Sequence, residues 1–352
     1  MQNFAERNAD NLNKESVMKE TRDKARDLMK GYCRVCPVCN GKACVNEVPG
    51  MGGVGTARSF QANIEALADI SFNMRVIHDN NSPQTKVSVL GYDLDVPVIA
   101  APIGGVSFNM GGKVSEDDYI QSVLDGCQEK GTIGCTGDGV PEFIHESAFT
   151  AIKKLGGHGI PFIKPWEDEE LFKKLEMAVE TGTKVVGIDI DAAGLITLKK
   201  MGRPVSAKSS TKLKEIIGKF PVKFILKGIM TPDAAKLAVD TGAAGIVISN
   251  HGGRVLDHTP GVASILEQTA KDVKGQIEIL ADGGIRTGGD VLKMLALGAD
   301  AVMIGRPFSV AAMGGLKEGV ASYIDSLILE LQQTMVLTGC ADVTSADMTL
   351  LT

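Results

Sequence analysis

Polar side chains follow several apolar segments in the second half of the chain, and their types suit acid–base chemistry. His251 is followed by two glycines and then by Arg254. A neutral imidazole accepts a proton near pH 7, and a guanidinium can bind a carboxylate through two parallel hydrogen bonds. The pattern predicts a catalytic base, His251, beside a clamp for an anionic substrate, Arg254. Asp191 is the candidate partner for the second imidazole nitrogen.

Lys227 is a further candidate for the same site, because it ends an apolar run that begins at Phe224. It is either a surface lysine whose stem packs on apolar side chains, or a cation placed beside a developing negative charge. A lone histidine in a loop is likewise more often a structural hydrogen-bonding group than a base. Because such residues follow five different apolar segments, we expect one shared site and assign Lys227 to it.

Two glycine–arginine motifs near the C-terminus predict an anion site. They are Asp282-Gly-Gly-Ile-Arg286 and Gly305-Arg306. Glycines let backbone N–H groups approach a phosphate, and arginines pair with its charge. Turn glycines with surface arginines are the alternative. A phosphate here would belong to a bound cofactor or to a phosphorylated substrate.

The apolar segments that must position these residues repeat with a long period. Four begin at glycines (Gly131, Gly182, Gly242, Gly298), three follow prolines (Pro97, Pro161, Pro221), and one is Ile277-Glu-Ile-Leu. Interleaved, they predict eight strands that alternate with helices, which is the pattern of a (β/α)8 TIM barrel whose active site lies at the C-terminal strand ends. A doubly wound sheet is the competitor, but no glycine-rich dinucleotide turn follows the first strand.

The repeat divides the chain into two predicted domains. Residues 95–352 form the barrel, closed by a long C-terminal helix over residues 316–337. Residues 1–94 form a helical, cysteine-rich cap over the bottom or flank of the barrel, with helices over 11–30 and 63–73 and a strand over 86–90.

The motifs around Lys227, His251, Arg286 and Arg306 resemble the FMN-dependent α-hydroxy-acid oxidase and dehydrogenase family, most strongly over residues 222–342. The resemblance implies a (β/α)8 barrel that oxidises the C2 carbon of an (S)-2-hydroxy acid, such as lactate or glycolate, to the 2-keto acid. It implies His251 as base, Asp191 as its partner and Lys227 beside the flavin ring. The implied FMN-binding residues are Ala101, Pro102, Lys164, Asp189, Lys227, Ser249, Asp282, Gly283, Gly284, Arg286, Gly305 and Arg306. It also implies a homo-oligomer, a tetramer by family likeness.

The chain departs from the family pattern on the substrate side. Trp166 stands where the family carries a tyrosine, so we expect it to contact the substrate, and Lys164 and Asp189 replace a glutamine and a threonine. Leu198 and Lys199 stand where the family has a second arginine. These departures leave room for an alternative, an FMN-dependent isomerase without net redox change. A non-catalytic flavin- or metal-binding protein is a third possibility, which the coincidence of His251, Arg254, Asp191 and Lys227 disfavours.

Four cysteines lie close together in the predicted cap, at Cys33, Cys36, Cys39 and Cys44. Four thiolates can bind Zn or an Fe–S cluster, and iron there could exchange electrons with the flavin. Free thiols are the alternative. With no signal-peptide or membrane-span pattern, we expect a cytoplasmic protein without a membrane partner, and the net charge of -6 argues against nucleic acid. The sequence does not fix the electron acceptor.

Overall fold

Eight parallel strands close into a barrel in the computed structural model, which describes residues 17–195, 198 and 201–352. The order around the barrel is β10-β3-β4-β5-β6-β7-β8-β9. Each strand coincides with one of the eight predicted segments, so the TIM-barrel prediction is confirmed. The strands are β3 (Val98–Ile103), β4 (Gly134–Thr136), β5 (Ile160–Ile163), β6 (Val185–Asp189), β7 (Lys223–Ile229), β8 (Gly245–Ile248), β9 (Glu278–Ala281) and β10 (Ala301–Ile304).

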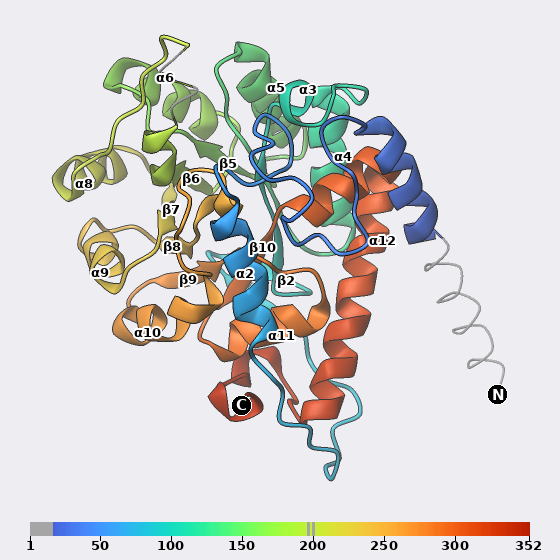
Figure 1. The fold of residues 1–352 in the computed structure, drawn as a ribbon. Helices are drawn as coiled ribbons and strands as arrows, with labels where there is room; N and C mark the ends of the chain where they lie inside the picture. The colour runs from blue at the N-terminus through green and yellow to red at the C-terminus, as the bar shows by residue number, and fades with distance from the viewer. Residues whose placement is uncertain (1–16, 196–197, 199–200) are drawn as a thin grey trace.

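Helices surround the strands (Figure 1). Several begin at a hydroxyl side chain that caps the first turn, such as Thr287, whose Oγ1 accepts from Asp290 N in a capping box. The helices are α3 (Val106–Asn109), α4 (Glu116–Glu129), α5 (Glu142–Lys154), α6 (Asp168–Val179), α8 (Ser210–Lys219), α9 (Pro232–Asp240), α10 (Ala263–Val273), α11 (Gly288–Ala296) and α12 (Arg306–Thr338).

The long closing helix, α12, is present but begins ten residues earlier than predicted. Leu316 has φ 50° and ψ -139°, which breaks the helical path within α12. The prediction from residue 316 therefore captured only the second part of the helix. A helix over residues 17–28 packs against the first part, where a Cβ on Gly314 would lie 1.9 Å from the carbonyl oxygen of Thr21. The rest of the predicted 11–30 helix, up to residue 16, lies outside the described residues.

The alternation of side chains along each strand decides which residues point into the barrel. In β7, Ile225 packs inside the barrel, and Phe224 and Leu226 pack toward the helices. Because successive strand residues face opposite sides, Lys227 points inward at the top of the lumen. The same alternation in β6 brings Asp189 inward, opposite Lys227 in the strand register.

Residues 17–94 cover both ends of the barrel. A hairpin of β1 (Val87–Val89) and β2 (Tyr92–Leu94) packs its apolar side chains into the interior cluster and closes one end. Residues 50–54 lie at the opposite end, since Val54 N donates to the carbonyl oxygen of Gly253 just after β8. The prediction that the whole cap covers the bottom or flank is therefore wrong for this stretch.

The second predicted cap helix is also displaced. It spans α2 (Arg58–Ala68), not 63–73, and buries Phe60, Asn63 and Leu67. Among the described residues, no helix is long and apolar enough to cross a membrane.

Candidate active site

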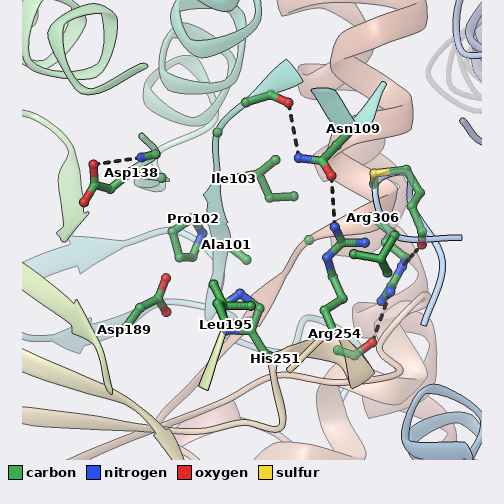
Figure 2. A pocket seen from close by; sticks show the side chains of 18 of the residues that line it. Ala101, Pro102, Ile103, Asn109, Asp138, Asp189, Leu195, His251, Arg254 and Arg306 are labelled. Atoms are coloured by element: carbon green, nitrogen blue, oxygen red, sulfur yellow. Dashed lines mark hydrogen bonds between the residues drawn. The ribbon is translucent and has the colours of Figure 1, made fainter. Parts of the chain in front are cut away.

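A cavity of about 450 Å³ lies at the C-terminal ends of the strands. Its size falls within the range of small-ligand and cofactor pockets. Figure 2 shows Arg254 and Arg306 on one side of it and Asp138 and Asp189 on the other. The predicted residues that line it are Ala101, Pro102, Lys164, Asp189, Lys227, His251, Arg254, Asp282, Gly283, Gly284, Arg286, Gly305 and Arg306.

His251 and Asp191 form a pair at this end of the barrel. The Nδ1 atom of His251 lies 3.0 and 3.1 Å from the two carboxylate oxygens of Asp191. Burial acts to raise the pKa of Asp191, but the nearby His251 and Lys227 outweigh it and hold that pKa below the ordinary value. Asp191 is thus an anion that fixes the imidazole through one nitrogen and leaves the other for chemistry.

Lys227 lies among three carboxylates. Its Nζ atom is 3.1 Å from Asp189 Oδ1 and 4.0 Å from Asp282 Oδ2. Burial acts to lower the pKa of Lys227, but Asp189, Asp191 and Asp282 together raise it above its usual range. The lysine is therefore a buried, permanent cation, and the surface-lysine alternative is wrong.

Asp282 has the opposite character. Burial raises its pKa despite the attraction of Lys227 and a 2.8 Å hydrogen bond from Ser249 Oγ. Its Oδ1 atom is buried without a hydrogen-bond partner. A buried carboxyl oxygen without a partner, facing a cavity, is a position where a ligand donor can bind.

The donor atoms of Asp189, Asp191 and His251 lie within 4.8 Å of one another, a spacing a metal ion can bridge. Lys227 already supplies the positive charge that such a cluster needs, so this group does not call for a metal.

Arg254 reaches across the cavity to the cap. It donates to the carbonyl oxygens of Gly50 and Gly52 at 2.6 and 3.1 Å. It also donates to Asn109 Oδ1 at 3.0 Å (Figure 2). Among the described residues it has no carboxylate partner, and burial lowers its pKa to about 10. A buried guanidinium bonded only to neutral oxygens is suited to bind an anion.

The residues of the predicted anion cradle line the same cavity. Gly283 and Gly284 have φ of 92° and 87°, and a Cβ on either would lie within 3.0 Å of Asn63. Burial and the neighbouring Arg254 lower the pKa of Arg306 to about 9. The Nε atom of Arg286 is buried without a hydrogen-bond partner.

Neither arginine of the cradle has a carboxylate partner in the described part of the chain. Two guanidinium groups without a carboxylate partner, together with the unpaired N–H donor of Arg286, fit a phosphate. With the pocket volume and the adjacent Lys227, the residues present fit FMN.

Two of the predicted site residues, Ser249 and Trp166, do not line the cavity. Ser249 is fully buried and lines no part of the cavity; its Oγ atom donates to Asp282 and accepts from His251 N at 3.0 Å, so it positions both. The prediction that Trp166 contacts the substrate is wrong. Its ring is fully buried behind the cavity wall, where Nε1 donates to Asp138 Oδ2 at 2.5 Å.

Asp138 and Asn109 line the cavity but were missed by sequence reasoning. Asp138 follows β4 and accepts from Lys164 N, Trp166 Nε1 and Lys174 Nζ. The rule used for the other strands, a polar residue just after an apolar run, would have found it. Asn109 lies on the short helix α3, where no strand pattern marks it.

Two further predictions concern the substrate side and the cysteines. Leu198 lines the cavity, and Lys199 lies outside the described residues. The four cysteines of the cap lie apart from the catalytic cavity and line a neighbouring one. Their metal binding stays a prediction.

A (β/α)8 barrel with a phosphate cradle after its last two strands, a buried lysine and a histidine–aspartate pair defines an FMN-binding oxidoreductase. The comparisons agree. The family model described as FMN-dependent dehydrogenase matches residues 50–203 and 197–352, and the chain belongs to this family.

Glycolate oxidase 5 of Oryza sativa subsp. japonica is 30% identical over 331 residues, covering 81% of this chain and 86% of that protein. A peroxisomal (S)-2-hydroxyacid oxidase of Arabidopsis thaliana is 30% identical over 320 residues, covering 82% and 86%. A solved mandelate oxidase has a TM-score of 0.78 at 25% identity, covering 95% of this chain and 97% of its own. The predicted family, the enzyme class and FMN are therefore confirmed.

Proposed function

We propose that the protein oxidises the C2 carbon of a 2-hydroxy acid to the 2-keto acid, with FMN bound in the cavity. The observation that carries the proposal is the position of His251, held at Nδ1 by Asp191, in the same cavity as Arg254 and the phosphate cradle. The reaction removes a proton from the hydroxyl group and a hydride equivalent from C2. Bound FMN supplies the acceptor for that hydride equivalent.

His251 takes the hydroxyl proton. Asp191 bonds Nδ1, so Nε2 is the nitrogen available to the substrate. When the imidazole becomes charged, the adjacent carboxylate stabilises it, and the pair acts as one unit. Lys227 adds a buried positive charge to the cavity, which would stabilise negative charge on a cofactor bound beside it.

Arg254 binds the substrate carboxylate. Its contacts with Gly50, Gly52 and Asn109 orient the guanidinium toward the cavity, and none of them neutralises its charge. Gly283, Gly284, Arg286, Gly305 and Arg306 would hold the FMN phosphate, with Ala101 and Pro102 beside the ring. The base and the phosphate cradle are thus separate parts of one cavity.

The rest of the cavity favours an apolar substituent on the substrate. Its wall carries apolar side chains from three different segments: Phe108, Val140, Ile144, Leu195, Leu198 and Met201. Apolar surface binds apolar groups in proportion to the area removed from water. We therefore propose that the enzyme prefers 2-hydroxy acids with an apolar side chain of several carbons to glycolate.

An anaerobic titration tests the proposal. The purified yellow protein is mixed without oxygen with glycolate, with both enantiomers of lactate and with longer 2-hydroxy acids, and the flavin absorbance is followed. Loss of the flavin band, with one 2-keto acid formed per FMN, is the expected result. Protein that binds FMN but keeps its colour with every acid would contradict the proposal.

A further inference from the structure

The four cysteines of the cap surround a second cavity, of about 380 Å³. Cys33, Cys36, Cys39 and Cys44 all line it, and all four are partly buried. The segment is built from a turn in which Val35 has φ 44°, an unusual conformation for a β-branched residue. We infer that these four cysteines bind an iron–sulfur cluster of the [4Fe–4S] type in this cavity.

The spacing of the thiols favours a cluster over a single metal ion. Four thiolates on one zinc ion, each at about 2.3 Å, stand about 3.8 Å apart. Among the described residues, no three cysteine sulfurs lie within 4.8 Å of one another. In a cluster each thiolate binds a different iron, so the sulfur atoms stand farther apart around a larger volume. A cavity of this size suits that arrangement and is far larger than one ion needs.

The charge of the cavity wall fits the same ligand. Four thiolates and the sulfide ions of a cluster carry net negative charge. The basic residues on the wall are Arg22, Arg34, Arg286, Lys293 and Arg306, against one acidic residue, Asp290. The wall therefore favours thiolates once a metal has replaced the protons.

Hydrogen-bond donors already point at two of the sulfurs. Val35 N lies 3.4 Å from Cys33 Sγ, and Arg286 Nη2 lies 3.6 Å from Cys39 Sγ. Arg22 also fixes the cysteine loop, since its Nη2 donates to the carbonyl oxygen of Cys36 at 2.7 Å. Donors to the ligand sulfurs and a fixed ligand loop are features by which proteins bind and tune such clusters.

The site is an addition to the family's barrel. The family model begins at residue 50, so all four cysteines lie outside the matched residues. Met51, Gly284, Arg286 and Arg306 nevertheless line both this cavity and the catalytic one. A cluster here is separated from the flavin site by a single layer of residues.

Iron and acid-labile sulfide measured on the full-length protein, purified without oxygen, test the inference. About four of each per chain are expected, with an EPR signal after dithionite reduction. Cys36→Ser/Cys39→Ser should lose both. Cys340→Ser is the matched control, because Cys340 is buried elsewhere and donates to a carbonyl oxygen that serine can also reach.

Every other outcome contradicts the inference. One zinc per chain, neither metal in the anaerobic wild-type protein, or iron that persists in the double variant would each overturn it. The first two results are measured on the wild-type protein, so they test the inference even if the double variant misfolds. Iron and sulfide are measured without any 2-hydroxy acid, and the proposed oxidation is measured by anaerobic bleaching of the flavin, so failure of the cluster and failure of the oxidation are distinguished.

Discussion

Asp191 holds His251 through a single ring nitrogen, with Nδ1 at 3.0 Å from one carboxylate oxygen and 3.1 Å from the other. The two residues are sixty positions apart, one after β6 and one after β8, and the closed barrel brings them together. Gly228 on β7 permits the approach, since a Cβ there would lie 2.5 Å from Asp191 Cβ. The barrel thus fixes the orientation of the base before any substrate binds.

His251→Gln should stop oxidation and leave FMN binding intact. The base contributes about 10²- to 10⁴-fold to the rate, and its side chain is separate from the arginines of the phosphate cradle. Stopped-flow measurement of anaerobic flavin bleaching, with FMN content per chain, checks both parts. His258→Gln, an exposed histidine seven residues later, is the control and should keep the wild-type rate. Loss of FMN from His251→Gln would contradict the separation.

Arg254→Lys should raise KM for 2-hydroxy acids much more than it lowers kcat. A lysine keeps the charge but cannot bond Gly50, Gly52 and Asn109 while presenting two parallel donors to a carboxylate. Loss of one charged hydrogen bond, about 1.5–3 kcal/mol, corresponds to a KM about 10- to 100-fold higher. Steady-state kinetics give the split. Arg58→Lys, in an exposed ion pair with Glu65, should leave KM unchanged.

The strand ends were predictable because one local rule identifies them. Lys227 and Asp282 each stand where an apolar run meets a polar residue, and parallel strands deliver such residues to one face. The substrate contact of Trp166 was expected from the family resemblance instead, and it is wrong because the chain turns immediately after β5. Trp166 N donates to the carbonyl oxygen of Lys164, and the ring is buried away from the cavity.

The contacts between the cap and the barrel could not be predicted from the strand-end rule. The bonds from Arg254 to Gly50 and Gly52 depend on how a segment two hundred residues earlier docks on the barrel. No pattern in residues 45–55 carries that information, since the acceptors are backbone carbonyl oxygens, which every residue has. For the same reason, residues 50–54, which we expected at the bottom or flank of the barrel, lie beside the catalytic cavity instead.

Leu195→Ala should lower kcat/KM for a long apolar 2-hydroxy acid and change that for glycolate little. Leu195 lines the cavity, and removing apolar surface from a pocket of this kind weakens transition-state binding by about 1–3 kcal/mol, or about 10- to 200-fold. Leu237→Ala, at an exposed leucine on α9, is the control. Equal decreases for both acids would show that Leu195 supports the fold rather than the substrate side chain.

Lys174 and Asp138 form a buried ion pair at the cavity wall, with Nζ 2.7 Å from Oδ1 and both side chains at most 4% exposed. Removing one member of such a pair leaves the other charge buried, at a cost of about 3–5 kcal/mol. Lys174→Met should therefore lower the free energy of unfolding by about that amount at pH 7. Urea denaturation measures it, and Lys173→Met, an exposed neighbour on α6, is the control.

The destabilisation in Lys174→Met should shrink as the pH falls toward 4. In the wild-type protein burial acts to raise the pKa of Asp138, but Lys174 and Lys164 outweigh it and hold that pKa below the ordinary value. The pair therefore stabilises the fold above about pH 4, and the contribution is lost as pH falls further. Without Lys174 the effect of burial dominates, so protonating the carboxyl group at low pH relieves the variant. A destabilisation that stays the same from pH 7 to pH 4 would mean that Lys174 acts through packing on Trp166 instead.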